Sequence, residues 1–207
     1  MRKRSIATLV GLFTAVAGGI IPLHASSMFI DGDVPLGTPT PFSDSSNGLT
    51  ALFSSSADPG GFATSASFLS WGPEMLSSQG INLTLTVQFY SDAFLTTPAT
   101  VDWIQMDFGA NAAIPLQLVA LLGGPGGTQV GSSTATGTTI TVAPEGVISF
   151  GGPSFDTVEL TMLTDPNNPF GIFGVGNISD VPEPDYVWAF PVIGLGLAAW
   201  KRQASAR

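Results

Sequence analysis

The chain contains no cysteine, so disulfide bonds and thiol catalysis are excluded. Basic side chains are the second scarce class. All six Lys and Arg residues lie within the first four or the last seven positions, and the only histidine is His24. The central part of the chain therefore has to fold and act without cations and without thiols.

The stretch from Ser26 to Asp180 has thirteen carboxylates, because only Glu183 and Asp185 of the fifteen Asp and Glu residues lie outside it. It has no Lys, Arg or His. No Ser-His-Asp triad, Ser-Lys dyad or Schiff-base lysine can form there, and zinc would have only carboxylate ligands. The carboxylates of this stretch are expected to repel one another at low ionic strength, and the stretch should bind nucleic acid poorly.

The N-terminal segment has the order of a secretory signal peptide. A positive region at 2–4 precedes an apolar run from Ile6 to Ile21, and a small residue, Ala25, follows. We therefore expect residues 1–25 to be a signal peptide that signal peptidase removes after Ala25. The alternative is an uncleaved membrane anchor, and both interpretations export the residues that follow.

The C-terminal stretch, residues 181–207, has three zones. Two prolines stiffen the polar segment 181–184. The run from Tyr186 to Trp200 carries no charge and would span about 22 Å as a helix, less than the ~30 Å hydrocarbon core of a typical bilayer. A basic tail follows. These features predict a short transmembrane helix with its cations on the cytoplasmic side; a buried core helix is the alternative.

This order of motif, apolar helix and basic tail resembles the PEP-CTERM sorting signal over the last 27 residues. The motif residues are Val181, Pro182, Glu183 and Pro184, whereas Pro191 departs from the most Leu-rich examples. The resemblance implies that an exosortase, a membrane-embedded enzyme, recognises the segment and processes the protein near the motif. It also implies a role at the cell surface or in extracellular exopolysaccharide or biofilm material.

Alternation of apolar and polar residues recurs along residues 26–180 and predicts β-strands. The clearest examples lie at 81–90, 103–108, 116–122, 147–150 and 157–162, and Gly- and Pro-rich turns separate them. Helical spacing is suggested only at 74–79, and the Ser/Thr/Gly-rich segment 131–141 suits a weak edge strand or a loop. The pattern predicts an all-β antiparallel β-sandwich of about eight to ten strands, of jelly-roll type.

Three aspartates are candidate calcium ligands, since a hard cation prefers oxygen. Asp31 and Asp33 lie near the start of the predicted domain and Asp180 lies at its end, so they would meet if the first and last strands pair. The twelve-residue calcium-loop pattern is not completed, because Phe42 stands where Glu is required. The alternative is an ordinary Asp-Gly turn and a solvated acid.

Trp71 and Trp103 are the candidate carbohydrate contacts. The alternation predicts that Trp103 shares a strand face with Gln105 and Asp107, and an aromatic ring with polar neighbours suits a sugar. The alternative is that these tryptophans pack in the core at the edge of the sandwich.

The enzyme chemistry that the composition leaves open is glycoside hydrolysis by paired carboxylates. Glu74, Glu145 and Glu159, each with an Asp as partner, are the candidates, and no spacing among them selects a pair. The sequence therefore predicts an exported, non-enzymatic surface or matrix protein that needs no cofactor. A calcium-dependent carbohydrate-binding module and a glycan-cleaving enzyme are the two alternatives.

Overall fold

A computed structural model describes residues 27–30, 34–65, 75–78, 83–111, 113–137, 144–163 and 171–180. The predicted signal peptide, the sorting segment 181–207 and the candidate residues Asp31, Asp33, Trp71 and Glu74 lie outside these ranges. Every regular element within them is a β-strand. The described ranges hold no helix long and apolar enough to cross a membrane.

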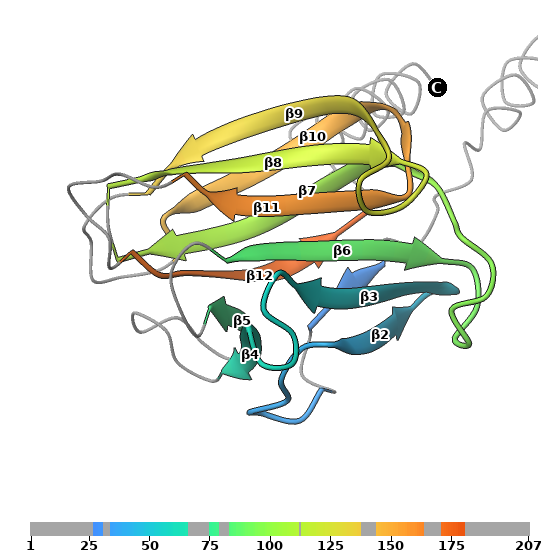
Figure 1. The fold of residues 1–207 in the computed structure, drawn as a ribbon, viewed down its shortest axis with the longest axis horizontal. Helices are drawn as coiled ribbons and strands as arrows, with labels where there is room; N and C mark the ends of the chain where they lie inside the picture. The colour runs from blue at the N-terminus through green and yellow to red at the C-terminus, as the bar shows by residue number, and fades with distance from the viewer. Residues whose placement is uncertain are drawn as a thin grey trace, which may run out of the picture.

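The strands of these ranges form two antiparallel sheets (Figure 1). Sheet A has the order β10 (Gly146–Phe155), β7 (Val101–Ala110), β12 (Phe173–Ser179), β5 (Met75–Ser78) and β4 (Phe62–Ser65), and β1 (Met28–Phe29) also pairs with β12. Sheet B has the order β2 (Phe42–Ser46), β3 (Leu49–Ser55), β6 (Thr84–Tyr90), β11 (Thr157–Met162), β8 (Pro115–Leu122) and β9 (Thr128–Thr136).

Eight of these strands have the connectivity of a jelly roll. The order β5-β12-β7-β10 in sheet A is matched by the order β6-β11-β8-β9 in sheet B, and from β5 to β12 the chain changes sheet at every step except from β8 to β9. This is the double Greek key of the jelly roll, so the predicted fold class is confirmed. The twelve strands exceed the number expected from the sequence, because β1 to β4 extend the two sheets.

The core lies between the sheets and follows the alternation of the strands. In β6 every second residue from Leu85 to Phe89 is buried, whereas the residues between them are half-buried. The rings of Phe62 and Phe173 meet edge-on with their centroids 5.3 Å apart, a favourable geometry for aromatic pairs. The fully buried phenylalanines are Phe29, Phe53, Phe62, Phe89, Phe155 and Phe173. A core of this size can hold the sheets together without disulfide bonds.

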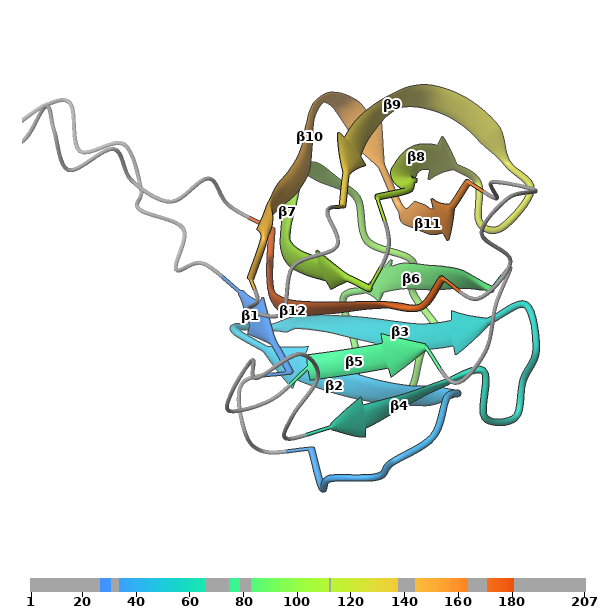
Figure 2. The same ribbon diagram turned by 90° about the vertical axis from the view of Figure 1, so that its left-hand side faces the viewer.

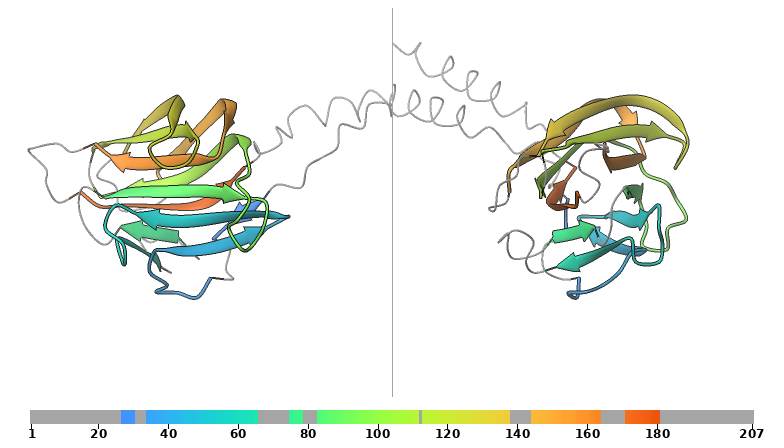
Figure 3. Two further views of the ribbon diagram at one scale, coloured as in Figure 1. Left: turned by 45° about the vertical axis from the view of Figure 1, so that its right-hand side comes forward. Right: turned by 60° about the vertical axis from the view of Figure 1, so that its left-hand side comes forward.

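The two margins of the sandwich are built differently. Strands β9 and β10, from different sheets, lie beside each other at one margin, and β2 and β4 lie at the opposite one (Figures 2 and 3). Gly131 of β9 contacts the ring of Phe150 of β10 so closely that a Cβ would overlap the ring. The segment predicted as a weak edge strand or a loop is thus an edge strand up to Thr136.

The described part of the segment with a suggestion of helical spacing is a strand and not a helix. Residues 75–78 form β5, which pairs with β4 on one side and with β12 on the other. The ladders on both sides use the backbone groups that a helix would pair internally. A pattern this short is overridden by tertiary pairing.

Candidate functional site

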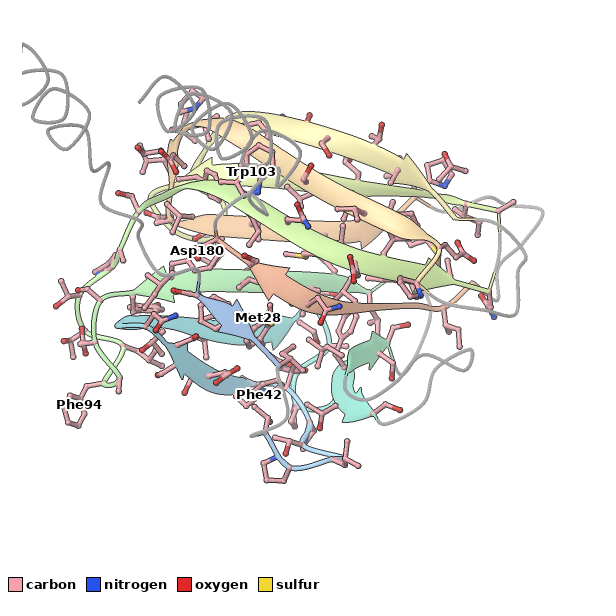
Figure 4. The ribbon with its side chains drawn as sticks, turned by 180° about the vertical axis from the view of Figure 1, so that it is seen from behind. Met28, Phe42, Phe94, Trp103 and Asp180 are labelled. Atoms are coloured by element: carbon pink, nitrogen blue, oxygen red, sulfur yellow. The ribbon has the colours of Figure 1, made fainter. Side chains whose placement is uncertain are left out.

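Trp103 lies on the outer face of sheet A, where the alternation of β7 places it (Figure 4). Trp103, Gln105 and Asp107 are half-buried, and the residues between them are buried. The indole ring covers Gly151 of β10, and a Cβ at Gly151 would overlap it. Trp103 is therefore an outward-facing aromatic residue whose ring also packs against the neighbouring strand.

One polar side chain on the same face of β7 as Trp103 is already hydrogen-bonded. Asp107 accepts a hydrogen bond of 2.7 Å from Nδ2 of Asn177, which lies on β12 with φ of 46°. Nε1 of Trp103 is buried and has no hydrogen-bond partner among the residues that the structure describes, an arrangement that costs free energy. This face offers an aromatic ring, but its indole N–H is inaccessible to a ligand.

Asp180 joins the two ends of the described domain. The first and last strands do pair, with Met28 opposite Ser179 and Phe29 opposite Ile178. Oδ1 of Asp180 accepts a 2.8 Å hydrogen bond from the amide of Ser27. Burial raises the pKa of Asp180, the bonds from Ser27 oppose this, and the nearby charge of Asp102 adds to it. No group of three potential metal-ligating side chains occurs among the described residues.

Glu145 and Glu159 lie on opposite sides of the sandwich. Glu159 is half-buried on the outer face of β11 in sheet B, in register with Thr86 and Val119. Glu145 precedes β10 of sheet A, where its amide donates to the carbonyl of Phe108 at 2.8 Å. Sheets stack about 10 Å apart, whereas the carboxylates of glycosidases lie roughly 5–9.5 Å apart. These two glutamates therefore do not form a catalytic pair with each other.

A cleft that the sequence analysis missed lies where β6 ends. This end of β6 is on the right in Figure 1. Its volume is about 290 Å³. The walls come from the end of β6 and the loop after it, the Gly-rich loop after β8, and the connection from β10 to β11. The lining residues are Gln88, Phe89, Tyr90, Pro98, Gly123, Gly124, Asp156 and Thr157.

Asp156 holds the Gly-rich wall of the cleft in place. Oδ2 accepts a hydrogen bond from the amide of Gly123 and Oδ1 accepts one from the amide of Gly124, both at 2.9 Å. Thr157 Oγ1 donates to Oδ1 at 2.9 Å. Gly123 and Gly124 have φ values of 97° and 82°, a region that residues with a Cβ rarely adopt. The two glycines thus allow consecutive amides to turn toward one carboxylate.

The opposite wall begins with an extension of β6. Tyr90 forms a bridge with Pro98, and the amide of Ala99 donates to the carbonyl of Phe89 at 2.9 Å. The amide of Ser91 donates to the carbonyl of Thr97 at 2.9 Å. These bonds close residues 91–98 into a tight loop and fix Pro98 beside Tyr90.

Asp92 orders the tip of this loop, which we call the β6–β7 loop (residues 91–98). Its carboxylate accepts bonds from the amides of Phe94 at 2.9 Å and Thr97 at 2.8 Å, and from Oγ1 of Thr96 at 3.1 Å. Burial acts to raise the pKa of Asp92, but the bonds from Thr96 and Thr97 outweigh it and lower that pKa. Phe94 projects from the tip with 87% of its surface exposed (Figure 4).

The chemistry of the cleft favours binding. Its titratable side chains are Asp156, which is fixed by three hydrogen bonds, and Tyr90. Gln88 contributes an amide with both donors and an acceptor. Apolar walls with a few fixed polar groups are typical of small-molecule sites.

Part of this site left a signal in the sequence. The alternation of β6 places Gln88 and Tyr90 on the polar face, directly before a turn. The Gly- and Pro-rich segment 123–127 predicts only a turn. The contact between Gly123 and Asp156 spans 33 positions of the chain, and local patterns do not reveal contacts of that range.

No family model and no curated protein matches the sequence. Among solved structures, the chain is similar to a mutant family 29 carbohydrate-binding module in complex with mannohexaose, with a TM-score of 0.41 and 7% identity over 75% of this chain and 90% of that one. The family 32 module of AlyQ, in complex with 4,5-unsaturated mannuronic acid, gives 0.38 and 13% over 63% and 94%. The family 11 module of a cellulosomal cellulase of Clostridium thermocellum gives 0.35 and 14% over 77% and 95%. Likenesses at these TM-scores say nothing about the ligand of this chain.

Proposed function

We propose that this chain is an exported, non-catalytic β-sandwich protein that binds extracellular polysaccharide. The cleft at the end of sheet B carries the proposal. Tyr90 and Pro98 line it beside two polar side chains, the amide of Gln88 and the carboxylate of Asp156, whereas the ring of Phe89 is buried in the core. A sugar presents apolar C–H surfaces together with hydroxyl groups, and a cleft of this composition suits both.

The inventory of side chains supports binding rather than catalysis. The sequence from Ser26 to Asp180 contains no His, Lys, Arg or Cys. Glu159 lies on the outer face of sheet B and Glu145 lies beside β7 of sheet A, so the two carboxylates do not share a face of the sandwich. The carboxylate in the cleft, Asp156, already serves as the acceptor for two backbone amides and a hydroxyl.

Export and sorting complete the proposal. Signal peptidase would remove residues 1–25 after Ala25, and an exosortase would recognise Val181–Pro184 while the apolar helix holds the chain in the membrane. The location of every cation in the two end segments supports this. The hydrogen bond from Ser27 to Asp180 also means that both segments join the domain at one point.

The binding half is tested by comparing two aromatic residues on opposite sheets. We expect Tyr90→Ala to lower the affinity for a polysaccharide at least tenfold, because it removes one wall of the cleft. Trp103→Ala on sheet A is the matched control, and urea unfolding verifies that both variants fold. Loss of binding in Trp103→Ala with normal binding in Tyr90→Ala would move the site to the outer face of sheet A. Absence of binding to every glycan in a broad panel would refute the proposed function.

The sorting half is tested in the producing cell. Replacement of Pro182, Glu183 and Pro184 by alanine is expected to leave a longer species in the membrane fraction. Mass spectrometry of the fractions measures this. Normal release with an unchanged mass would contradict recognition of the motif.

Calcium dependence is a separate hypothesis, and it rests on the pairing of the first and last strands that β1 and β12 show. Of the three candidate calcium ligands, Asp180 alone lies within the described residues. Its carboxylate accepts a hydrogen bond from the amide of Ser27. A chelator distinguishes the cases: a fall in affinity and in melting temperature, both restored by calcium, would favour a calcium-dependent module.

A further inference from the structure

We infer that the cleft selects an uncharged sugar ring with free neighbouring hydroxyls and rejects anionic sugars such as uronates. This inference rests on the proposed function and specifies its ligand. Four observations carry it: the charge around the cleft, the unused acceptor position on Asp156, the position of Gln88, and the size of the cleft.

The charge around the cleft is negative without compensation. Asp156 lines the cleft, Glu159 lies on the same outer face of sheet B, and Asp92 orders the adjacent loop. The sequence from Ser26 to Asp180 has no cationic side chain to neutralise a bound carboxylate. Like charges brought together in a partly desolvated site repel strongly. An anionic sugar would therefore meet repulsion, whereas a neutral sugar would not.

Asp156 is preset to accept a hydroxyl group. A carboxylate has about four lone-pair positions, and the amides of Gly123 and Gly124 and the hydroxyl of Thr157 use three of them. Of these bonds only the one from Gly123 goes to Oδ2. A sugar hydroxyl can donate to the remaining position, and a hydrogen bond to an ionised acceptor is stronger than one between neutral groups.

Gln88 is placed to contact a second hydroxyl of the same ring. It lies on β6 in register with Thr157, the neighbour of Asp156 in the chain. Its Nε2 approaches the Gly-rich loop, 4.0 Å from the position of a Cβ at Gly124. Adjacent strands are roughly 4.8 Å apart, so the amide and the carboxylate can contact neighbouring groups of one ring.

The size of the cleft limits how much of a glycan it contains. Its volume of about 290 Å³ lies at the lower end of the range of about 300–1,000 Å³ for small-molecule sites. A space of this size accommodates one sugar unit with its hydroxyls, and a free monosaccharide should therefore compete with the polysaccharide.

Titration calorimetry on the intact protein tests this inference with a neutral gluco- or manno-oligosaccharide, an alginate oligosaccharide of the same length, and the free neutral sugar as competitor. We expect the neutral ligand to bind with little dependence on salt, the free sugar to compete, and alginate not to bind at low salt. Gln88→Ala should lower the affinity for the neutral ligand about tenfold. Gln117→Ala, which removes another half-buried Gln on the outer face of sheet B, is the matched control and should leave it unchanged.

Each result that differs from these expectations would contradict the inference, the location of the site, or the proposed function. Binding of alginate at low salt without a divalent cation, or failure of the free sugar to compete, would overturn the inference while a glycan-binding function stands. An equal effect of Gln88→Ala and Gln117→Ala would remove the cleft as the site. Absence of binding to any neutral or anionic glycan would overturn the proposed function itself.

Discussion

Single aspartates in this protein stabilise loops and strand ends by accepting hydrogen bonds. Other proteins use salt bridges and disulfide bonds for this purpose. Asp58 accepts hydrogen bonds from the amide and the hydroxyl of Ser55, and Asp44 accepts one from the amide of Ile30. Asp92 and Asp156 each bind backbone amides in a loop. Because residues 26–180 include no Lys or Arg, backbone N–H groups are the main hydrogen-bond donors to these carboxylates.

Asp156 allows the contribution of one such carboxylate to stability to be measured. Asp156→Ala leaves the amides of Gly123 and Gly124 without their acceptor, and we expect a loss of about 1–3 kcal/mol in the free energy of unfolding. Urea denaturation measures it. Asp102→Ala, which removes an exposed carboxylate from β7, is the control and should change stability much less. Equal stability of the two variants would show that the loop does not depend on Asp156.

Asp92 gives a second test at this scale, with hydrogen exchange as the measurement. Asp92→Ala should speed exchange of the amides of Phe94 and Thr97, which bond to its carboxylate. Because the pKa of Asp92 is lowered on folding, protection should persist in mild acid and disappear as pH falls through that lowered value. Asp58→Ala serves as the control. Unchanged exchange at Phe94 and Thr97 would refute the role of Asp92.

At the scale of elements, the pairing of β1 with β12 includes a carboxylate whose pKa burial raises above the ordinary value of 3.8. A raised folded pKa favours the protonated form on folding. The stability that it contributes is therefore present at low pH and is lost as pH rises through the folded value. We expect Asp180→Asn, which retains an acceptor for Ser27, to be more stable than the natural protein at neutral pH, and this difference should disappear as the pH falls below the ordinary value of 3.8.

Thermal unfolding as a function of pH measures this difference. Asp102→Asn is the control, since it removes the neighbouring charge but leaves the half-buried carboxylate of Asp180 in place. A constant difference between Asp180→Asn and the natural protein across the acid range would contradict the assignment.

The predictability of each element from the sequence depended on its environment. Strands β6, β7 and β11 have one buried and one wet face, so alternation revealed them. β9 is an edge strand of Ser, Thr and Gly with little apolar contrast, and it could not be separated from a loop. The cleft escaped prediction because three distant segments form it, and Gly123 meets Asp156 only after the jelly roll is complete.

At the scale of the whole molecule, charge is the dominant feature. The thirteen carboxylates between residues 26 and 180 have no cationic partner among the side chains of that stretch, since the basic residues lie at the two ends. The Debye length is about 10 Å at 0.1 M salt, so added salt should screen their repulsion. We expect the melting temperature to rise from low salt to moderate salt. The melting temperature of the double variant Asp102→Asn with Asp107→Asn should rise less. A melting temperature of the natural protein that does not depend on salt would contradict this account.

The bond between Ser27 and Asp180 also has a mechanical consequence. The ends of the domain are neighbouring antiparallel residues, so opposing forces on the flanking segments pull across the β1–β12 ladder. Such a load breaks the bonds one after another, first at Ser27 and then at Met28 and Phe29, and it does not shear them all at once. A domain held by both ends should therefore yield at low tension by peeling off β1, while the jelly roll of eight strands stays folded.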